Sequence, residues 1–235
     1  MLQDLKEAVC AANLALNDAG LVVLTWGNVS GRDAASGLVA IKPSGVDYAV
    51  MRPEHMVIVD LEGRVVEGEL RPSSDTPTHL VLYRAFDGLG GVAHSHATHA
   101  VAWAQARRAL PCYGTTHADT FRGAVPVTDA MTAAEVGGDY ELETGHVIVR
   151  AFRDRSPLQT PGVLVAGHGP FTWGASAAKA VENSIVLEEC ARMAALTEAI
   201  NPQAGPIADY LLDKHFLRKH GEAAYYGQRR ADHGT

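Results

Sequence analysis

Cysteine is scarce in this chain, and the three that occur, Cys10, Cys112 and Cys190, lie far apart. An odd number at such wide spacing fits neither a disulfide framework nor a Cys-x-x-Cys metal site, so we expect a reducing compartment. The chain also lacks an apolar run close to the ~18 residues that a membrane span requires. Its first residues carry acidic side chains where a secretory leader would carry basic ones. We therefore predict a cytoplasmic protein without a membrane partner.

An excess of positive charge is missing as well. The formal net charge is −7, which argues against a protein that binds nucleic acid or an anionic membrane. One dense basic run, from Lys214 to Arg230, is interrupted by acidic, aromatic and apolar residues, and we interpret it as a local segment that attracts an anion or faces a partner. With 235 residues, 47% of them hydrophobic, the chain is long enough for one domain with a substantial core.

Helix and strand signals alternate along the chain. Apolar periodicity predicts helices over residues 3–18, 77–86, 98–108, 175–200 and 207–219, with Thr76 as N-cap of the second. Short apolar or β-prone runs predict strands over 21–24, 38–41, 91–96, 143–152 and 162–168, and a hairpin that joins 56–60 to 64–67. This alternation indicates a layered α/β domain, and the hairpins argue against an all-parallel sheet.

Three histidines in two separate stretches are candidate metal ligands. His94 and His96 follow a short β-prone run, and side chains two apart on a strand point to the same face. His168 ends a second strand-like run and stands between two glycines. A catalytic zinc commonly takes three protein ligands and keeps a fourth position open. A lone His-x-His pair is more simply the solvated side of a strand, so the metal site depends on the fold bringing His168 to the pair.

Three loops have the composition of a phosphate site: Gly27-Asn28, Lys42-Pro-Ser-Gly45, and Ser73-Ser74 with Asp75. Small residues, hydroxyl groups and a freely turning backbone can offer several hydrogen bonds to phosphate oxygens at once, and Lys42 could supply positive charge. Any one of these loops is better explained as an ordinary surface turn. Together with a metal site, they suggest a small phosphorylated substrate.

Several longer stretches occur in an order that resembles a known family. They are Thr25-Trp-Gly-Asn-Val-Ser30, Ile41-Lys-Pro-Ser-Gly-Val-Asp-Tyr48, Pro72-Ser-Ser-Asp-Thr-Pro-Thr-His79, His94-Ser-His96, Gly114-Thr-Thr-His-Ala-Asp119, Gly167-His-Gly-Pro-Phe171, Leu211-Leu-Asp-Lys-His215 and Tyr225-Tyr-Gly-Gln228. The order resembles the class II aldolase superfamily and, within it, the L-ribulose-5-phosphate 4-epimerases. Because the resemblance extends to Gln228, it predicts a domain over residues 1–228 and a polar tail over 229–235.

The resemblance implies a fold, a cofactor and an assembly. The expected fold is a single-domain α/β/α sandwich around a central, largely antiparallel sheet, and the expected assembly is a homotetramer with active sites between subunits. The implied metal is Zn²⁺, or another divalent cation such as Mn²⁺ or Co²⁺, held by Asp75, His94, His96 and His168. The implied substrate and phosphate ligands are Gly27, Asn28, Ser44, Gly45, Ser73 and Ser74, to which we add Lys42 for its charge. Asp119 and Tyr226 are expected to exchange protons, with Tyr226 and His215 entering from the neighbouring subunit.

The implied reaction interconverts L-ribulose 5-phosphate and D-xylulose 5-phosphate. Carbon 4 of this ketopentose is not adjacent to the carbonyl group, so its C–H bond is not acidic enough for simple removal and return of a proton. Cleavage of the bond between carbons 3 and 4 leaves the enediolate of dihydroxyacetone and glycolaldehyde phosphate, and a divalent cation can stabilise the enediolate oxygens. Addition to the other face of the aldehyde inverts carbon 4. We expect the two acid/base groups on opposite sides, with the pKa of Asp119 raised and that of Tyr226 lowered.

Two other functions stay open. A class II sugar-phosphate aldolase would release the aldehyde, although the aldolases of the superfamily carry a glutamate where this chain has Asp75. A non-catalytic interaction module on the same fold is disfavoured by the metal histidines together with Asp119 and Tyr226. The native metal, and the pathway, whether arabinose breakdown or another pentose route, are left open by the sequence.

Overall fold

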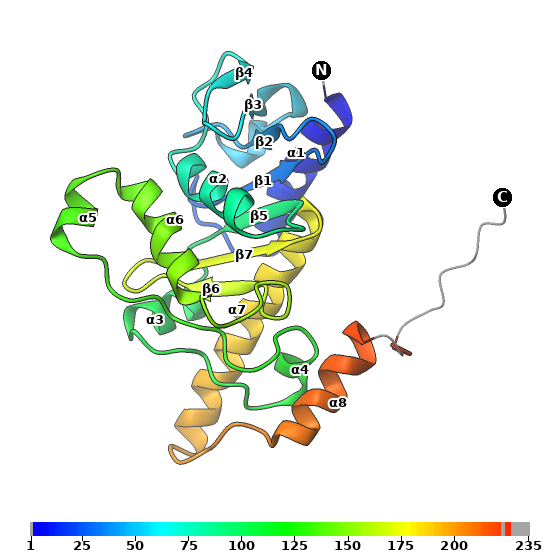
Figure 1. The fold of residues 1–235 in the computed structure, drawn as a ribbon, viewed down its shortest axis with the longest axis vertical. Helices are drawn as coiled ribbons and strands as arrows, with labels where there is room; N and C mark the ends of the chain where they lie inside the picture. Colours follow the sequence, from blue (N-terminus) through cyan, green and yellow to red (C-terminus); the bar gives the residue numbers. More distant parts are fainter. Residues whose placement is uncertain (1, 222–223, 227–235) are drawn as a thin grey trace, which may run out of the picture.

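A seven-stranded sheet with the order β4-β3-β2-β1-β5-β7-β6 forms the centre of the protein (Figure 1). The structure is a computed structural model, and it describes residues 2–221 and 224–226. All neighbouring strands pair antiparallel. The strands are β1 Asn28–Arg32, β2 Val39–Ile41, β3 Val57–Val59, β4 Val65–Glu67, β5 Gly91–His94, β6 Gly162–Leu164 and β7 Pro170–Gly174.

Helices cover both faces of this sheet. The α-helices are α1 Gln3–Asp18, α2 Thr76–Ala85, α3 Thr98–Gln105, α4 Thr115–Ala118, α5 Ala133–Gly137, α6 Tyr140–Ala151, α7 Ala177–Ile200 and α8 Asp209–His220, and two 3₁₀ turns span η1 Tyr48–Val50 and η2 Pro53–His55. Helix α8 lies away from the sheet beside α4, at the lower end of the molecule in Figure 1. In the described part of the chain, no helix combines the length and the apolar character that a membrane span would require.

Strand β2 shows how the two faces are filled. Its side chains alternate between the faces, as expected for a pleated strand. Ala40 packs in the cluster that contains Val9 of α1 and Val181 of α7, whereas Val39 and Ile41 pack with the residues of α2 and α6. The predicted α/β/α sandwich with a largely antiparallel sheet is therefore confirmed.

The predicted strand over residues 21–24 is wrong. This apolar segment forms no strand, because both edges of the neighbouring strand β1 are already paired with β2 and β5. Leu24 instead adopts a positive φ of 56°, and Val23 and Leu24 are 55% and 76% exposed. Leu21 is buried in the core, so only the second half of this apolar run lies on the surface, before the turn that carries Gly27.

The predicted strand over residues 143–152 is wrong as well, because these residues belong to helix α6. Its buried residues Thr144, Val147 and Ile148 follow helical spacing, and Glu141 and Glu143 in the first turn complement the helix dipole. The helix packs on α2 through Gly145, where an added Cβ would lie 2.6 Å from the Cβ of Val81. The β-prone run His-Val-Ile-Val is therefore overridden by packing against another helix.

Candidate metal centre and substrate cavity

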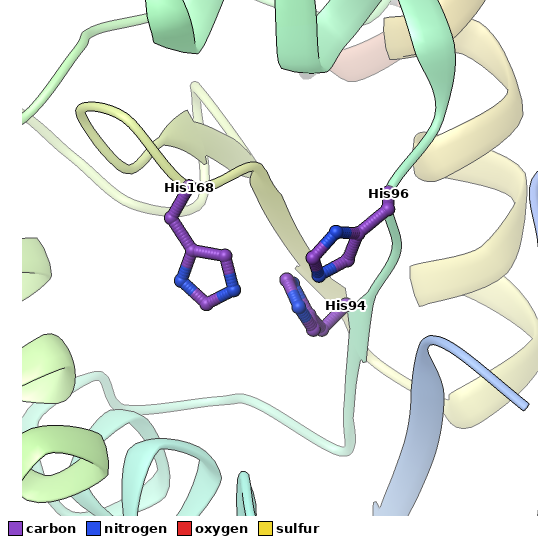
Figure 2. Close-up of side chains that lie close together, drawn as sticks. All are labelled: His94, His96 and His168. Carbon is purple, nitrogen blue, oxygen red and sulfur yellow. The ribbon is translucent and has the colours of Figure 1, made fainter.

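Three imidazole rings converge at one end of the central strands (Figure 2). His94 ends β5, His96 follows it before α3, and His168 lies in the turn between β6 and β7. One ligand nitrogen from each ring lies within 4.8 Å of the others. The prediction that His96 continues the strand is wrong in detail, since β5 ends at His94. The three rings nevertheless meet, as the proposed metal site requires.

Sheet register explains this convergence. His94 pairs with Asn28 of β1 on one side and with Phe171 of β7 on the other. The β6–β7 turn therefore lies next to His94, and it carries His168. His94 also stacks on Phe171 at a centroid distance of 4.2 Å, and its Nδ1 lies 2.9 Å from the carbonyl oxygen of Pro170. Because only a protonated Nδ1 can donate to that oxygen, Nε2 keeps its lone pair for a metal.

The protonation states of the site suit a cation. Burial, with further contributions from His94 and His96, lowers the pKa of His168 to about 4. Burial works to raise the pKa of Asp75, but the neighbouring His94 and His79 lower it on balance. A neutral imidazole at His168 and an ionised carboxylate at Asp75 are the forms that bind a divalent metal, and imidazole ligands suit zinc and similar transition ions.

Asp75 lies close to the imidazoles without joining their group. Its Oδ2 accepts a hydrogen bond of 2.6 Å from Nδ2 of Asn28. Among the residues that the structure describes, the ligand group within 4.8 Å consists of the three histidines. The role of Asp75 as a further metal ligand therefore stays a prediction.

One cavity of about 470 Å³ gathers the metal and phosphate candidates. All eleven residues predicted to hold the metal or the substrate line it, together with Thr25 and Trp26, which were not assigned a role. The eleven are Gly27, Asn28, Lys42, Ser44, Gly45, Ser73, Ser74, Asp75, His94, His96 and His168. Residues from five separate stretches of sequence are thus brought to one place.

The backbone of the cavity demands glycine at Gly27. Its φ is 82°, and a Cβ added there would lie 2.8 Å from the carbonyl oxygen of His94. The turn therefore passes against the metal strand at a distance that no other residue permits without displacement. Gly45 also has a positive φ, of 69°, and in the described part of the chain neither its N–H nor that of Ser74 donates to a protein acceptor.

Lys42 lines the same cavity as these free N–H groups and carries a cationic side chain. Its side chain is almost fully buried, and its Nζ lies 5.0 Å from the centroid of the Tyr48 ring. Burial lowers the pKa of Lys42, although the charges of Asp47 and Asp75 oppose this effect. Its Nζ donates at 3.4 Å to the carbonyl oxygen of Pro43 and forms no salt bridge within the described residues, so this buried ammonium group is well suited to an anionic ligand.

The three residues predicted to move protons lie elsewhere. Asp119, His215 and Tyr226 do not line the cavity of the histidines. Asp119 follows α4, and its Oδ1 lies 3.0 Å from Nδ1 of His215 on α8. Arg218 binds both oxygens of the carboxylate, at 3.1 and 2.7 Å, and its guanidinium lies 4.8 Å from the centroid of the Tyr226 ring. The three residues therefore form one group within a single chain.

The predicted rise in the pKa of Asp119 is wrong. Burial acts in that direction, but hydrogen bonds from Arg218 and His215 and the charge of Lys219 lower the pKa instead. The sequence placed Arg218 and Lys219 in a basic run, without any sign that they would meet Asp119. His215 contacts Asp119 of its own chain, and the entry of His215 and Tyr226 into a neighbouring subunit stays a prediction.

Tyr140 is a residue near the metal candidates that the sequence did not indicate. Its hydroxyl group lies 3.4 Å from Nδ1 of His168. It begins helix α6, which overlaps the segment predicted as a strand, so no pattern in the sequence pointed to this contact.

This fold is shared with a known class of proteins. Residues 7–195 match the family described as Class II Aldolase and Adducin N-terminal domain, and the chain belongs to this family. Among its relatives is the L-ribulose-5-phosphate 4-epimerase UlaF of Salmonella paratyphi B (strain ATCC BAA-1250 / SPB7), which is 56% identical over 228 residues, covering 97% of this chain and 100% of that protein.

Solved structures agree with this assignment. An L-fuculose 1-phosphate aldolase is 26% identical, with a TM-score of 0.74 over 90% of this chain and 94% of that one. The L-fuculose 1-phosphate aldolase from Glaciozyma antarctica PI12 is similar in fold, with a TM-score of 0.77 over 94% of this chain and 84% of that one, at 21% identity.

Proposed function

We propose that this protein is a metal-dependent L-ribulose-5-phosphate 4-epimerase, which interconverts L-ribulose 5-phosphate and D-xylulose 5-phosphate by breaking and re-forming the bond between carbons 3 and 4. One observation carries the proposal: three converging imidazoles and three phosphate-type loops line the same cavity. It is supported by the 56% identity to a full-length protein named for that activity.

In this proposal His94, His96 and His168 hold the metal, with Asp75 as a further ligand. Zn²⁺ is the first candidate, and Mn²⁺ or Co²⁺ are alternatives with compatible ligand preferences. When bound, the cation supplies Lewis-acid stabilisation of the negative charge that develops on the substrate oxygens as the carbon–carbon bond breaks.

The loops bind and orient the sugar phosphate. The ammonium group of Lys42 and the free N–H groups of Gly45 and Ser74 provide donors for phosphate oxygens, and the hydroxyls of Ser44 and Ser73 add to them. Oδ1 of Asn28 is buried and has no partner within the described residues. It can accept a hydrogen bond from a substrate hydroxyl, which would satisfy this group.

Asp119 and Tyr226 move the proton of the oxygen on carbon 4. Because their group lies outside the cavity of its own chain, we propose that it completes the cavity of a neighbouring subunit in a homotetramer. Exposed apolar side chains in the segment that leads to the cavity support such a contact: Val23, Leu24 and Trp26 are between 51% and 76% exposed, and Trp26 lines the cavity. His215 and Arg218 then hold the Asp119 carboxylate ionised, so Asp119 acts first as the base.

The test is incubation of the purified protein with L-ribulose 5-phosphate, with and without a chelator. We expect D-xylulose 5-phosphate, its loss after chelation, and its return when Zn²⁺, Mn²⁺ or Co²⁺ is added. Release of dihydroxyacetone and glycolaldehyde phosphate into solution would indicate an aldolase instead. No turnover by the metal-loaded protein would contradict both activities.

A further inference from the structure

The helix that follows the metal strand begins without a local cap. Helix α3 has Ala97 at its N-cap position, and no side chain of its own start accepts a hydrogen bond from its first turn. Alanine cannot supply the oxygen that Ser, Thr, Asp or Asn provides at this position. The first N–H groups of α3 therefore require an acceptor from another part of the protein.

Glu188 of helix α7 provides that acceptor. Its Oε1 accepts from the backbone N–H of His99 at 3.0 Å, and its Oε2 accepts from the backbone N–H of Ala100 at 2.9 Å. Nδ1 of His99 lies 2.8 Å from the same Oε1. The Glu188 side chain is 12% exposed, so these charge-assisted bonds are shielded from water. A carboxylate at a helix N-terminus also complements the helix dipole.

This cap lies three residues from a metal ligand. The segment Ser95-His96-Ala97 joins the end of β5 to the start of α3. At one end it is held by the pairing of His94 with Phe171 and at the other by the cap that Glu188 provides. Between them, the bond from Ser95 N to the Pro170 oxygen is long, at 3.5 Å, and Oγ of Ser95 has no partner among the described residues. The position of His96 thus depends on where α3 begins.

We infer that Glu188 is a positioning residue of the metal centre: by capping α3 from α7, it sets the position of His96 relative to His94 and His168. The inference rests on the proposed function only in requiring that the three imidazoles bind a cation. It assigns to Glu188 and His99 a role that no metal-ligand pattern in the sequence indicates, since Glu188 lies 20 residues beyond His168 in the chain.

The test compares Glu188→Gln with Glu189→Gln, measured by titration of the metal-free protein with Co²⁺ against a chelator that reports free metal. Glu189 is the next residue of α7, is half exposed and pairs with Arg192, so its variant makes the same chemical change away from α3. We expect Glu188→Gln to weaken Co²⁺ binding about 10-fold, the lower end of the effect known for residues that orient metal ligands, and to change the visible spectrum of the bound ion. Glu189→Gln should match the wild type in both respects.

A rescue variant separates positioning from general stability. Ser in place of Ala97 can cap α3 locally, so Glu188→Gln combined with Ala97→Ser should recover most of the Co²⁺ affinity. If Glu188→Gln fails to fold, as judged by circular dichroism, Glu188→Asp takes its place, because its carboxylate remains but is one methylene shorter. The same loss of affinity is expected from it.

The outcomes distinguish this inference from the proposed function. A wild-type protein that binds no Co²⁺ would overturn the proposed function, and the inference with it. If the wild type binds Co²⁺ and the Glu188→Gln and Glu189→Gln variants bind it with equal affinity, the inference alone is overturned. A lower melting temperature of Glu188→Gln with unchanged Co²⁺ affinity and spectrum would also overturn it, because the cap would then stabilise the fold without placing His96.

Discussion

Two groups of polar residues in this protein are built in different ways. The cavity of the histidines is assembled from strand ends and adjoining turns of one sheet, so hydrogen-bond register sets the positions of its side chains. The group around Asp119 is assembled from α4 and α8 at the edge of the molecule, and ion pairs hold it together. In the first group, the N–H groups of Gly45 and Ser74 have no acceptor within the described residues, whereas in the second the Asp119 carboxylate is already paired.

The difference indicates a division of tasks. Residues that bind a metal and a phosphate need a rigid frame, which a paired sheet provides. The proton exchange proposed for Asp119 needs a defined ionisation state. Burial acts to raise the pKa of this carboxyl group, but hydrogen bonds from Arg218 and His215 and the charge of Lys219 lower it on balance. If the two groups meet only between subunits, each can be altered without disturbing the other, and the following predictions test that separation.

The largest effect is expected from His94→Asn. This change removes an imidazole whose ring centroid lies 5.0 Å from that of His96 and 4.8 Å from that of His168, and which stacks on Phe171. We expect metal binding to fall by more than about 100-fold, because loss of a ligand exceeds the effect of losing a residue that orients one. Epimerase turnover should disappear with it. Co²⁺ titration measures the metal affinity of both variants. His146→Asn, on the exposed side of α6, is the control and should bind Co²⁺ like the wild type.

Asp119→Asn should reduce turnover and leave metal binding unchanged. The expected loss is about 10²–10⁴-fold in kcat, the range for a general acid or base. Asp213→Asn is a matched control, since Asp213 lies on α8, the helix that carries the partners of Asp119, and makes an exposed ion pair with Arg122. Parallel loss of Co²⁺ affinity and kcat in Asp119→Asn would show that the two groups are not independent.

Gly27→Ala should damage the cavity by another route. A side chain at a φ of 82° is strained by about 1–3 kcal/mol, and the added Cβ would also press on the carbonyl oxygen of His94. We expect a lower free energy of unfolding and a weaker affinity for Co²⁺. Gly123→Ala provides the comparison, because Gly123 has a φ of 95° and no atom within 4 Å of an added Cβ. Its variant should lose stability while Co²⁺ affinity is kept.

The smallest effect concerns the loss of folding stability at low pH. Burial lowers the pKa of His79 to about 3 and the pKa values of His117 and His168 to about 4. In the unfolded chain these imidazoles would take up protons near pH ~6.5, so the metal-free protein should lose stability as pH falls from there to about 4. The lowered pKa of Asp119 adds stability above its unfolded pKa of ~3.9, and this contribution is lost only as pH falls through the lower folded value.

Urea unfolding at several pH values measures this dependence. His117→Gln should make the free energy of unfolding less dependent on pH between pH ~6.5 and about 4, because the unfolded state then binds one proton fewer relative to the folded state. An unfolding free energy that is independent of pH in that interval would contradict the burial of neutral histidines.

Much of the site could be predicted because its residues carry local chemistry. His94, His96 and His168 stand at the ends of β-prone runs, and Gly27 and Gly45 mark turns with a positive φ. What failed depended on partners far along the chain. The segment 143–152 became a helix through packing on α2, and Asp119 acquired a lowered pKa from Arg218 and His215, about 100 residues away.

The sequence by itself determined which residues could bind a metal and a phosphate, because ligand chemistry and turn geometry are properties of residue types and their near neighbours. Only the tertiary structure decided which of them meet. Strand register brought His168 to His94, and helix α7 supplied through Glu188 the cap that α3 lacks. Such contacts join residues distant in the chain, and no local pattern of side chains encodes them.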